Sequence, residues 1–376
     1  MRCSPTRLLT NMKKSKNNSK PFAIVVTDVH LDRGNSGLVK DIFNQLISLC
    51  HERGVSNVIC AGDVFTTRSG QPLECLSAWQ EILGALRDNK IVIDVIPGNH
   101  DKTDGNDECS YLDVYDGAYR WVRLHRVGST QYFCDNSVRV DFIPYFGTKR
   151  WMEEFEIGEG RDYEDGVVKL KILVTHVAFN GVRNADGSEV VDGIAPAVVK
   201  DYDAVICGHY HDRSTVGSNI HYVGSAYQNN YGEGCVDKGF AVLYEDGSIE
   251  YVQSRFPRYI KETIQANDRE TLTNLLEKYG DKEGRVDHVR FEFVGSKADL
   301  ERLDVTELQT RYGIDCKFNS VEEREAVESS QGEDVLNYDV SSVTKNFYRF
   351  CAENNIRGAE LKYGVGLIKI LKCGLR

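Results

Sequence analysis

The sequence predicts an α/β fold in which two sheets pack on each other and helices cover their outer faces. Two observations predict it. From Phe22 to about Phe256, strand-like apolar runs alternate with segments whose apolar residues recur at helical spacing. Several strand-like runs are apolar at consecutive positions, which is typical of strands buried on both faces. The 376 residues are many for a single core, so we expect two domains and a small third element.

The first part of the chain predicts three buried strands that alternate with two amphipathic helices. The strands are expected over 22–28, 57–63 and 91–101, and the helices over 36–54 and 73–89. Gly54 is expected to end the first helix. This βαβαβ order indicates an α/β core.

The middle of the chain is richer in strands. They are expected over 121–127, 131–134, 138–145, 169–177 and 203–209. HYVGS, GFAVLYEDG and SIEYVQSR follow, and Asp246-Gly247 between the last two is a strong hairpin signal. Every polar motif described below lies just past the C-terminal end of a predicted strand, where α/β sheets bind their ligands.

The composition changes after Pro257. The order strand, helix, strand, helix, strand follows and predicts a small separate α+β domain, in which one helix spans 297–313. The tail predicts an amphipathic helix over 340–355, while 361–372 stays open between helix and strand. The polar start of the chain, rich in Lys, Asn and Ser, is expected to be disordered. The predicted divisions are 1–20, 21–256, 257–330 and 331–376.

Cysteine usage and hydropathy indicate a cytosolic protein. The polar, Lys-rich start and the chain length suit a bacterial or phage chain, so the cytosol of a bacterium or of a phage-infected host is the expected location. The eleven cysteines include no CxxC pair, so a cysteine-ligated zinc site is not expected. No apolar run reaches the roughly 20 residues that span a bilayer. The N-terminus lacks the apolar core and cleavage site of a secretory signal. We therefore expect reduced thiols and no membrane partner.

The formal net charge of −11 argues weakly against a nucleic-acid partner, because affinity for phosphate backbones usually comes from Lys and Arg. Two divalent cations would add about four positive charges where a substrate binds. Net charge therefore does not exclude DNA.

Five polar clusters carry the chemistry, and each follows an apolar run. They are Asp28-Val29-His30, Gly62-Asp63, Gly98-Asn99-His100-Asp101, His176 and Gly208-His209-Tyr210-His211. With His100 and Asp101 set aside, they supply two carboxylates, one amide and four imidazoles, which are oxygen and nitrogen ligands suited to divalent cations. One such cluster recurs by chance, but five in this order predict two metal ions that share one carboxylate.

The spacing predicts how the ligands divide between the two ions. Asp28 and His30 follow a strand, where alternation places residues two apart on one side, so both would hold one ion. Asp63 ends the neighbouring strand and would bridge both ions, roughly 3.5–4 Å apart. The remaining ligands are Asn99, His176 and His209 for the second ion and His211 for the first. His176 stands alone, and a lone histidine is often only a core or surface residue.

His100 remains for chemistry. It would contact the phosphate or protonate the leaving oxygen as a general acid. Asp101 would orient its imidazole and stabilise the cationic form, although a carboxylate here can also simply cap the next turn. No serine or cysteine nucleophile motif is present, so water activated by the metals is the expected nucleophile. The histidines outside any motif, expected to be structural, are His51, His125, His221 and His288.

These motifs, in this order, resemble the calcineurin-like metallophosphoesterase superfamily over about 22–256. Within it, the chain looks most like the SbcD/Mre-type nuclease subunits of ATPase-coupled DNA-repair complexes, T-even-type phage homologues included. The stretch HYVGSAYQNNYGE (221–233) resembles the Gly-Ser segment that follows Gly-His-x-His in these nucleases. The resemblance implies a two-sheet metallophosphoesterase sandwich, a DNA-binding capping domain over 257–330 and a helical ATPase-binding tail over 331–376.

The resemblance also implies a function. Family members are 3′-to-5′ exonucleases and endonucleases that use two metal ions, here expected to be manganese. Their partners are DNA and a coiled-coil ATPase of the SbcC or Rad type. They form homodimers through helices near the motifs. Residues 73–86 are a candidate for that contact, although their apolar face could equally cover the sheet. The implied ligands are Asp28, His30, Asp63 and His211 for the first metal, and Asp63, Asn99, His176 and His209 for the second.

One position departs from the resemblance, and two other functions stay open. Many of these nucleases have His or Asp where this chain has Thr66, so exonuclease activity is altered, Arg68 compensates, or the position has drifted. A stand-alone phosphomonoesterase or cyclic-nucleotide phosphodiesterase on the same core would leave roughly 120 residues unexplained. A non-catalytic interaction module would be expected to have lost some of the ligands.

Overall fold

The computed structural model describes residues 19–117, 119–159, 167–184, 187–234 and 237–320. Most of the start expected to be disordered (1–20), together with the expected linker and ATPase-binding tail (331–376), lies outside these residues. The described residues form two compact units. The first holds 19–260 and 286–288, and the second holds 261–285 and 289–320.

The first unit contains two six-stranded sheets. The strands of the first sheet are β1 (Pro21–Val26), β2 (Asn57–Cys60), β3 (Val92–Val95), β4 (Val122–Leu124), β11 (Gly239–Tyr244) and β12 (Ile249–Gln253). Their order is β12-β11-β1-β2-β3-β4, and β1 to β4 run parallel. The hairpin predicted at Asp246-Gly247 is confirmed, because β11 and β12 pair antiparallel across it and Gly247 has a φ of 80°.

The second sheet also contains four parallel strands, but it has one antiparallel strand at each of its two edges. Its strands are β5 (Ser129–Phe133), β6 (Val138–Ile143), β7 (Leu170–Thr175), β8 (Ala204–Cys207), β9 (Ser214–Val216) and β10 (Ile220–Tyr222). Their order is β5-β6-β7-β8-β10-β9, with β6, β7, β8 and β10 parallel. The parallel strands of both sheets bring their C-terminal ends to sheet edges, which is where ligands bind in such folds.

The two sheets pack on each other because side chains along each strand alternate between opposite faces. In β1, Val25 belongs to the core between the sheets, together with Ile172 of β7. Its neighbours Ile24 and Val26 face the opposite side and pack with the helices. The predicted α/β sandwich of two sheets flanked by helices is therefore confirmed.

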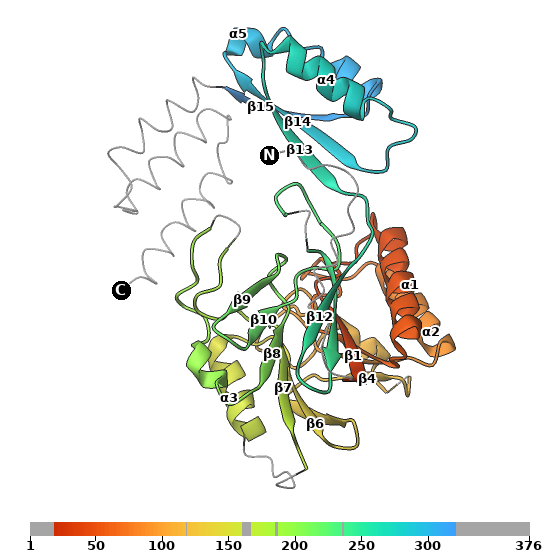
Figure 1. Ribbon diagram of the computed structural model, residues 1–376, viewed down its shortest axis with the longest axis vertical. Coiled ribbons are helices and arrows are strands. Elements are labelled where there is room, and N and C mark those ends of the chain that lie inside the picture. Colours follow the sequence, from red (N-terminus) through yellow and green to blue (C-terminus); the bar gives the residue numbers. More distant parts are fainter. Residues whose placement is uncertain (1–18, 118, 160–166, 185–186, 235–236, 321–376) are drawn as a thin grey trace, which may run out of the picture. The chain divides into compact units, whose positions relative to one another are not determined.

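Two of the flanking helices lie along the first sheet (Figure 1). They are α1 (Ser36–Arg53) and α2 (Leu73–Asp88), close to the predicted bounds. Gly54 ends α1 as predicted, with a φ of 66°. The apolar side chains that α2 contributes to the core are Ala78, Trp79, Ile82, Leu83 and Leu86. The apolar face offered above as a dimer contact thus covers the sheet of its own chain.

A third helix, α3 (Thr148–Glu159), covers the outer face of the second sheet and was not predicted. Trp151 packs with Leu173 of β7, and its Nε1–H donates to Thr175 Oγ1 at 2.8 Å. The helix was not predicted because its few apolar residues are interspersed with four glutamates, so the helical periodicity of the segment is weak. Two short 3₁₀ helices complete the unit, η1 (Tyr111–Tyr115) and η2 (Pro196–Val199).

The second unit is built on a three-stranded sheet of order β13-β14-β15, in which β14 and β15 run parallel. Its elements are β13 (Tyr259–Gln265), α4 (Arg269–Tyr279), β14 (His288–Gly295), α5 (Lys297–Leu300), α6 (Val305–Thr310) and β15 (Asp315–Ser320). The single helix predicted over 297–313 was wrong. Asp304 interrupts it, because its side chain accepts from the Glu307 backbone N–H and so begins a new helix.

Candidate metal centre

The predicted polar residues converge at one end of the sandwich. Asp28, Asp63 and Asn99 follow β1, β2 and β3 of the first sheet. His176 and His209 follow β7 and β8 of the second sheet. Each side chain is thus placed by the C-terminal end of a parallel strand, as the sequence predicted.

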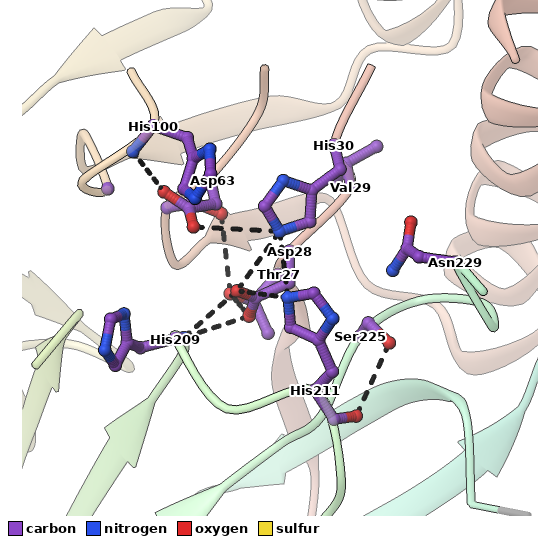
Figure 2. A network of polar contacts seen from close by, with 12 residues as sticks. Thr27, Asp28, Val29, His30, Asp63, His100, His209, His211, Ser225 and Asn229 are labelled. Carbon is purple, nitrogen blue, oxygen red and sulfur yellow. Dashed lines mark hydrogen bonds and ion pairs between the residues drawn. The ribbon is translucent and has the colours of Figure 1, made fainter. Parts of the chain in front are cut away.

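One group of donor atoms gathers around Asp28 (Figure 2). His30 Nε2 lies 3.9 Å from Asp28 Oδ1 and 3.7 Å from Asp63 Oδ2. His211 Nε2 lies 3.8 Å from Asp28 Oδ1 and 2.9 Å from His30 Nε2. This first cluster holds the residues expected for the first metal: Asp28, His30, Asp63 and His211.

A second group gathers on the other side of Asp63. His176 Nε2 lies 3.3 Å from Asp63 Oδ2 and 3.2 Å from Asn99 Oδ1. His209 Nδ1 lies 2.8 Å from the same Asn99 oxygen. This second cluster holds the residues expected for the second metal, and Asp63 Oδ2 faces both clusters.

The donor chemistry of both clusters fits divalent cations. Each offers carboxylate oxygen and imidazole nitrogen, and the ligand atoms of each histidine–aspartate group lie within 4.8 Å of one another. Asp28 and His176 are fully buried, and Asp63 is 2% exposed. The Nε2 atoms of the buried His30 and the half-buried His211 face each other at 2.9 Å, an arrangement that a shared cation would satisfy.

Four of the donor residues have left-handed backbones. The φ angles of Asp28, His30, Asp63 and His209 are 51°, 46°, 53° and 86°. The expected explanation for Asp28 and His30, alternation along a strand, was therefore wrong, because β1 ends at Val26 and both residues lie in the turn beyond it. Such conformations cost about 1–3 kcal/mol each and gather at functional sites.

Backbone hydrogen bonds hold these turns in place. Asp28 N–H donates to Gly62 O at 3.0 Å, and His30 N–H donates to Asp63 O at 3.0 Å. The glycines of the motifs allow a close approach. A Cβ on Gly98 would lie 2.2 Å from Asp63 Oδ1, and one on Gly208 would lie 2.4 Å from Ala61 O. The glycine that precedes the ligands in these motifs is therefore required by packing.

Two of the imidazoles are oriented through their Nδ1 atoms. His176 Nδ1 lies 2.8 Å from Ala61 O, which can only accept, so this nitrogen carries the proton. His211 Nδ1 lies 2.8 Å from Glu233 Oε1. In both residues the Nε2 atom is left to face the donor cluster.

The structure places His100 beside the centre but changes the expected role of Asp101. His100 N–H donates to Asp63 Oδ1 at 2.8 Å, and its Nδ1 lies 2.5 Å from Thr66 O. Asp101 instead accepts from the backbone N–H groups of Val64, Phe65 and Gly98. The carbonyl of Thr66 thus makes the contact with the His100 ring that the sequence assigned to Asp101, and Asp101 fixes the loops.

Thr66, the residue that departs from the resemblance, is part of this framework. Its hydroxyl donates to His30 O at 2.6 Å, and its carbonyl faces His100. Thr66 therefore connects a donor residue of the first cluster to the histidine assigned to chemistry. The neighbouring Arg68 contributes its carbonyl, which accepts from the Tyr111 hydroxyl.

Electrostatics divide the centre into charged and neutral groups. Burial opposes ionisation of Asp63, but the facing His176 and His30 imidazoles outweigh it and lower the pKa of Asp63. Burial also opposes the charge on His176, but Asp63 outweighs it and raises the pKa of His176 to about 9. Without metal, Asp63 and His176 therefore form an ion pair.

The other groups of the centre are shifted by burial itself. Burial, followed by the neighbouring His176, lowers the pKa of His209 to about 4. Burial likewise lowers the pKa of His30. Burial and then the nearby Asp63 raise the pKa of Asp101 to about 7, against three backbone hydrogen bonds that favour its charge. His30 and His209 are thus neutral near pH 7, which is the form that binds a cation.

Sequence reasoning gave no role to two charged residues behind the first cluster, Glu233 and Lys238. Glu233 contacts His211, and the Lys238 ammonium lies 3.0 Å from Glu233 Oε2 and 2.6 Å from His211 O. Glu233 ends the stretch 221–233 that was singled out, so a signal for it existed. Lys238 had none, because only folding brings it to His211.

The two clusters could hold two divalent cations side by side, and such a pair can clamp the attacking and leaving oxygens when a phosphate ester is hydrolysed. The fold and the site are therefore those of a binuclear metal phosphoesterase. The chain belongs to the calcineurin-like phosphoesterase family, whose model matches residues 23–213. Every donor of the two clusters lies inside that match.

Relatives of the chain are distant. A viral protein named as a phosphoesterase, 078R of Invertebrate iridescent virus 3, is 20% identical over 229 residues, which are 61% of this chain and 64% of that protein. The chain therefore spans less than two thirds of that relative. The calcineurin-like phosphoesterase YfkN from Bacillus subtilis is similar at 15% identity and a TM-score of 0.35, covering 69% of this chain and 96% of that one. A dimetal phosphatase from Danio rerio is similar at 11% identity and a TM-score of 0.35, covering 60% and 93%.

One negative finding concerns membranes. No helix among the described residues is both long and apolar enough to span a bilayer.

Proposed function

We propose that this phosphoesterase is a DNA nuclease, the nuclease subunit of an ATPase-coupled recombination and repair complex. The proposal rests mainly on one observation, that the stretch 221–233 contacts the first cluster. This stretch is the part of the sequence that resembles the SbcD/Mre-type nucleases, and its last residue, Glu233, bonds His211 of the first cluster. The nuclease-like segment is thus built into the metal centre.

The second unit also supports the proposal. The chain continues past the phosphoesterase unit into a separate sheet with three helices, over 261–285 and 289–320. An enzyme that hydrolyses a small phosphate ester does not need a second unit. A polymeric substrate, in contrast, extends beyond the metal centre and can be bound by the second unit as well. We propose that this unit is the DNA-binding capping domain.

The residues of the centre have separable tasks in this reaction. When bound, two divalent cations supply an activated water and stabilise the charge on the phosphate. Asp63 and the other donors of both clusters hold those cations. His100 is oriented by Thr66 O through Nδ1, so its Nε2 is the atom left to contact the phosphate or protonate the leaving oxygen.

Several parts of the proposal rest on the resemblance alone. We propose manganese as the metal, a coiled-coil ATPase of the SbcC or Rad type as partner and a homodimer as the assembly. The cytosol is proposed as the location from the cysteine usage instead. The tail proposed to bind the ATPase, 331–376, lies outside the described residues.

A second candidate is a stand-alone phosphomonoesterase or cyclic-nucleotide phosphodiesterase. The formal net charge of −11 favours it, because an acidic protein repels a polyanion more strongly than it repels a small ester. In this case the metal centre would be the same, and only the substrate would differ.

Hydrolysis of two substrates separates the candidates. Purified protein would be assayed with Mn²⁺ on duplex DNA and on a small chromogenic phosphodiester, with and without the coiled-coil ATPase. The proposal predicts manganese-dependent DNA cleavage that the ATPase stimulates. Turnover of the small ester with no cleavage of DNA under either condition would contradict it and favour the second candidate.

A further inference from the structure

A buried ion pair stands behind the first cluster, and neither of its members faces a metal position. Lys238 is 1% exposed, and its ammonium has oxygen atoms on every side. These are His211 O at 2.6 Å, Glu233 Oε2 at 3.0 Å, Ser225 Oγ at 3.0 Å and Asp212 Oδ1 at 3.1 Å. An ammonium has three protons to donate, so Lys238 is fully engaged in holding this segment.

Glu233 is surrounded by donors. Its Oε1 lies 2.8 Å from His211 Nδ1 and 3.2 Å from the amide nitrogen of Asn230. Its Oε2 accepts from the Asn229 backbone N–H at 3.1 Å and from Lys238. A carboxylate is the side chain that suits this position, because it accepts through both oxygens and donates through neither.

This arrangement decides which nitrogen of His211 carries the proton. Because Glu233 can only accept, His211 Nδ1 must donate to it, and the lone pair of the neutral ring is left on Nε2. His211 Nε2 is the atom that lies 3.8 Å from Asp28 Oδ1 in the first cluster. The ring is therefore presented to that cluster in the form that binds a cation.

We propose that Glu233 and Lys238 are positioning residues that determine occupancy of the first metal position and leave the second independent. The second position has a different support, because His176 is oriented by the backbone carbonyl of Ala61. A side-chain substitution leaves the backbone carbonyl of Ala61 in place, whereas it can remove the carboxylate of Glu233. A substitution of Glu233, which has no described hydrogen bond to Asn99, His176 or His209, should thus affect one metal position and not the other. The inference rests on the metal centre and not on DNA as substrate.

Glu233→Gln tests the proposal because it changes donors and acceptors at nearly constant shape. The amide has a single oxygen, and an N–H₂ at the Oε2 position would face two donors, the Asn229 backbone N–H and the Lys238 ammonium. The oxygen therefore takes that position, and the amide N–H₂ turns toward His211 Nδ1. That nitrogen must then accept, which moves the ring proton to Nε2 and removes the lone pair from the cluster. We expect affinity for one of two metals to fall by about 10- to 100-fold while the other is unchanged.

The measurement is calorimetric titration of the metal-free, full-length chain with Mn²⁺. The matched control is Glu250→Gln, which removes a carboxylate that also accepts from a cation, Arg53, at 2.8 Å, but outside both clusters. The proposal predicts two tight sites in the wild type and the control, and one tight site in the Glu233 variant. Two unchanged sites in Glu233→Gln would overturn it. Equal weakening of both sites, together with a lower melting temperature of the metal-free variant, would also overturn it and indicate general destabilisation.

A measurement on the wild type keeps the proposal testable if the variant does not fold. Imidazole nitrogen NMR of the metal-free chain, at alkaline pH where the His211 ring is neutral, reports its tautomer. The proposal predicts a proton on Nδ1, and a proton on Nε2 would overturn it. Neither experiment uses DNA, so a failure of the proposed nuclease activity would leave both readouts intact.

Discussion

In the proposed reaction, individual residues of the centre divide into those that would hold cations and one that would remain for chemistry. His100 belongs to the second kind, because its Nδ1 is taken by Thr66 O and its backbone N–H by Asp63. We predict that His100→Ala lowers hydrolysis by about 10²- to 10⁴-fold while both metals still bind. Turnover and metal content measured on the same sample check this. The control is His51→Ala, at an exposed position of α1. Loss of metal in the His100 variant would show that it is a ligand instead.

The pKa of His176 makes metal binding depend on pH. In the metal-free chain Asp63 raises this pKa to about 9, so the ring is protonated at neutral pH and must lose that proton to bind a cation. Affinity for the second metal should therefore rise with pH up to about 9 and then level off. His209, whose pKa is lowered to about 4, adds no such dependence near neutrality. Titration in two buffers of different ionisation enthalpy measures the released proton, and an affinity that does not change with pH would contradict the assignment.

The elements of the fold explain why three of the five motifs begin with glycine. Gly98 and Gly208 lie where loops from different strands come closest, and a Cβ on Gly208 would meet Thr27 Oγ1 at 2.2 Å. We predict that Gly208→Ala lowers the free energy of unfolding by about 3 kcal/mol and reduces metal affinity. Thermal unfolding is the measurement. The same change at Gly84 in α2, where the added Cβ would meet no atom within 4 Å beyond the backbone of its own helix and its chain neighbours, should instead stabilise by about 0.5–1 kcal/mol. A Gly208 variant as stable as the Gly84 variant would contradict this account.

At this scale, sequence reasoning succeeds where a signal is local. The apolar runs of β1, β2 and β3 and the Gly54 terminator of α1 were readable because they depend on neighbouring residues alone. The left-handed turns at Asp28 and His30 were missed, since they are held by backbone hydrogen bonds to residues 62 and 63, which lie in the loop after β2. The predicted helix over 297–313 was divided because Asp304 caps the N-terminus of α6, and the spacing of apolar residues gives no sign of that cap.

The candidate site shows the same limit. The donor residues were identified because each motif is short and follows a strand. The partners that orient them come from far along the chain. Glu233 lies 22 residues from His211, and Ala61 lies 115 residues from His176. Only the fold brings such groups together. The resemblance singled out the stretch that ends in Glu233 but not its contact with His211, and nothing in the sequence pointed to the carbonyl of Ala61.

In the first unit as a whole, the two sheets meet at the metal centre. The first sheet contributes Asp28, Asp63 and Asn99, and the second contributes His176 and His209. Cations bound there would therefore tie the sheets together. We predict that Mn²⁺ at 100 times its dissociation constant stabilises the fold by about 2.7 kcal/mol per site, and that a chelator reverses the effect. Melting temperature with and without metal measures this, and Asp63→Asn should abolish the response. A wild-type melting temperature unaffected by saturating metal would contradict the account.

The central claim is that the five motifs form one centre with two cations that share Asp63. Anomalous diffraction from crystals of the full chain grown with Mn²⁺ tests this directly. The account predicts two peaks roughly 3.5–4 Å apart, with Asp63 between them, Asp28, His30 and His211 on one peak, and Asn99, His176 and His209 on the other. A single peak, or two peaks that Asp63 does not join, would contradict it.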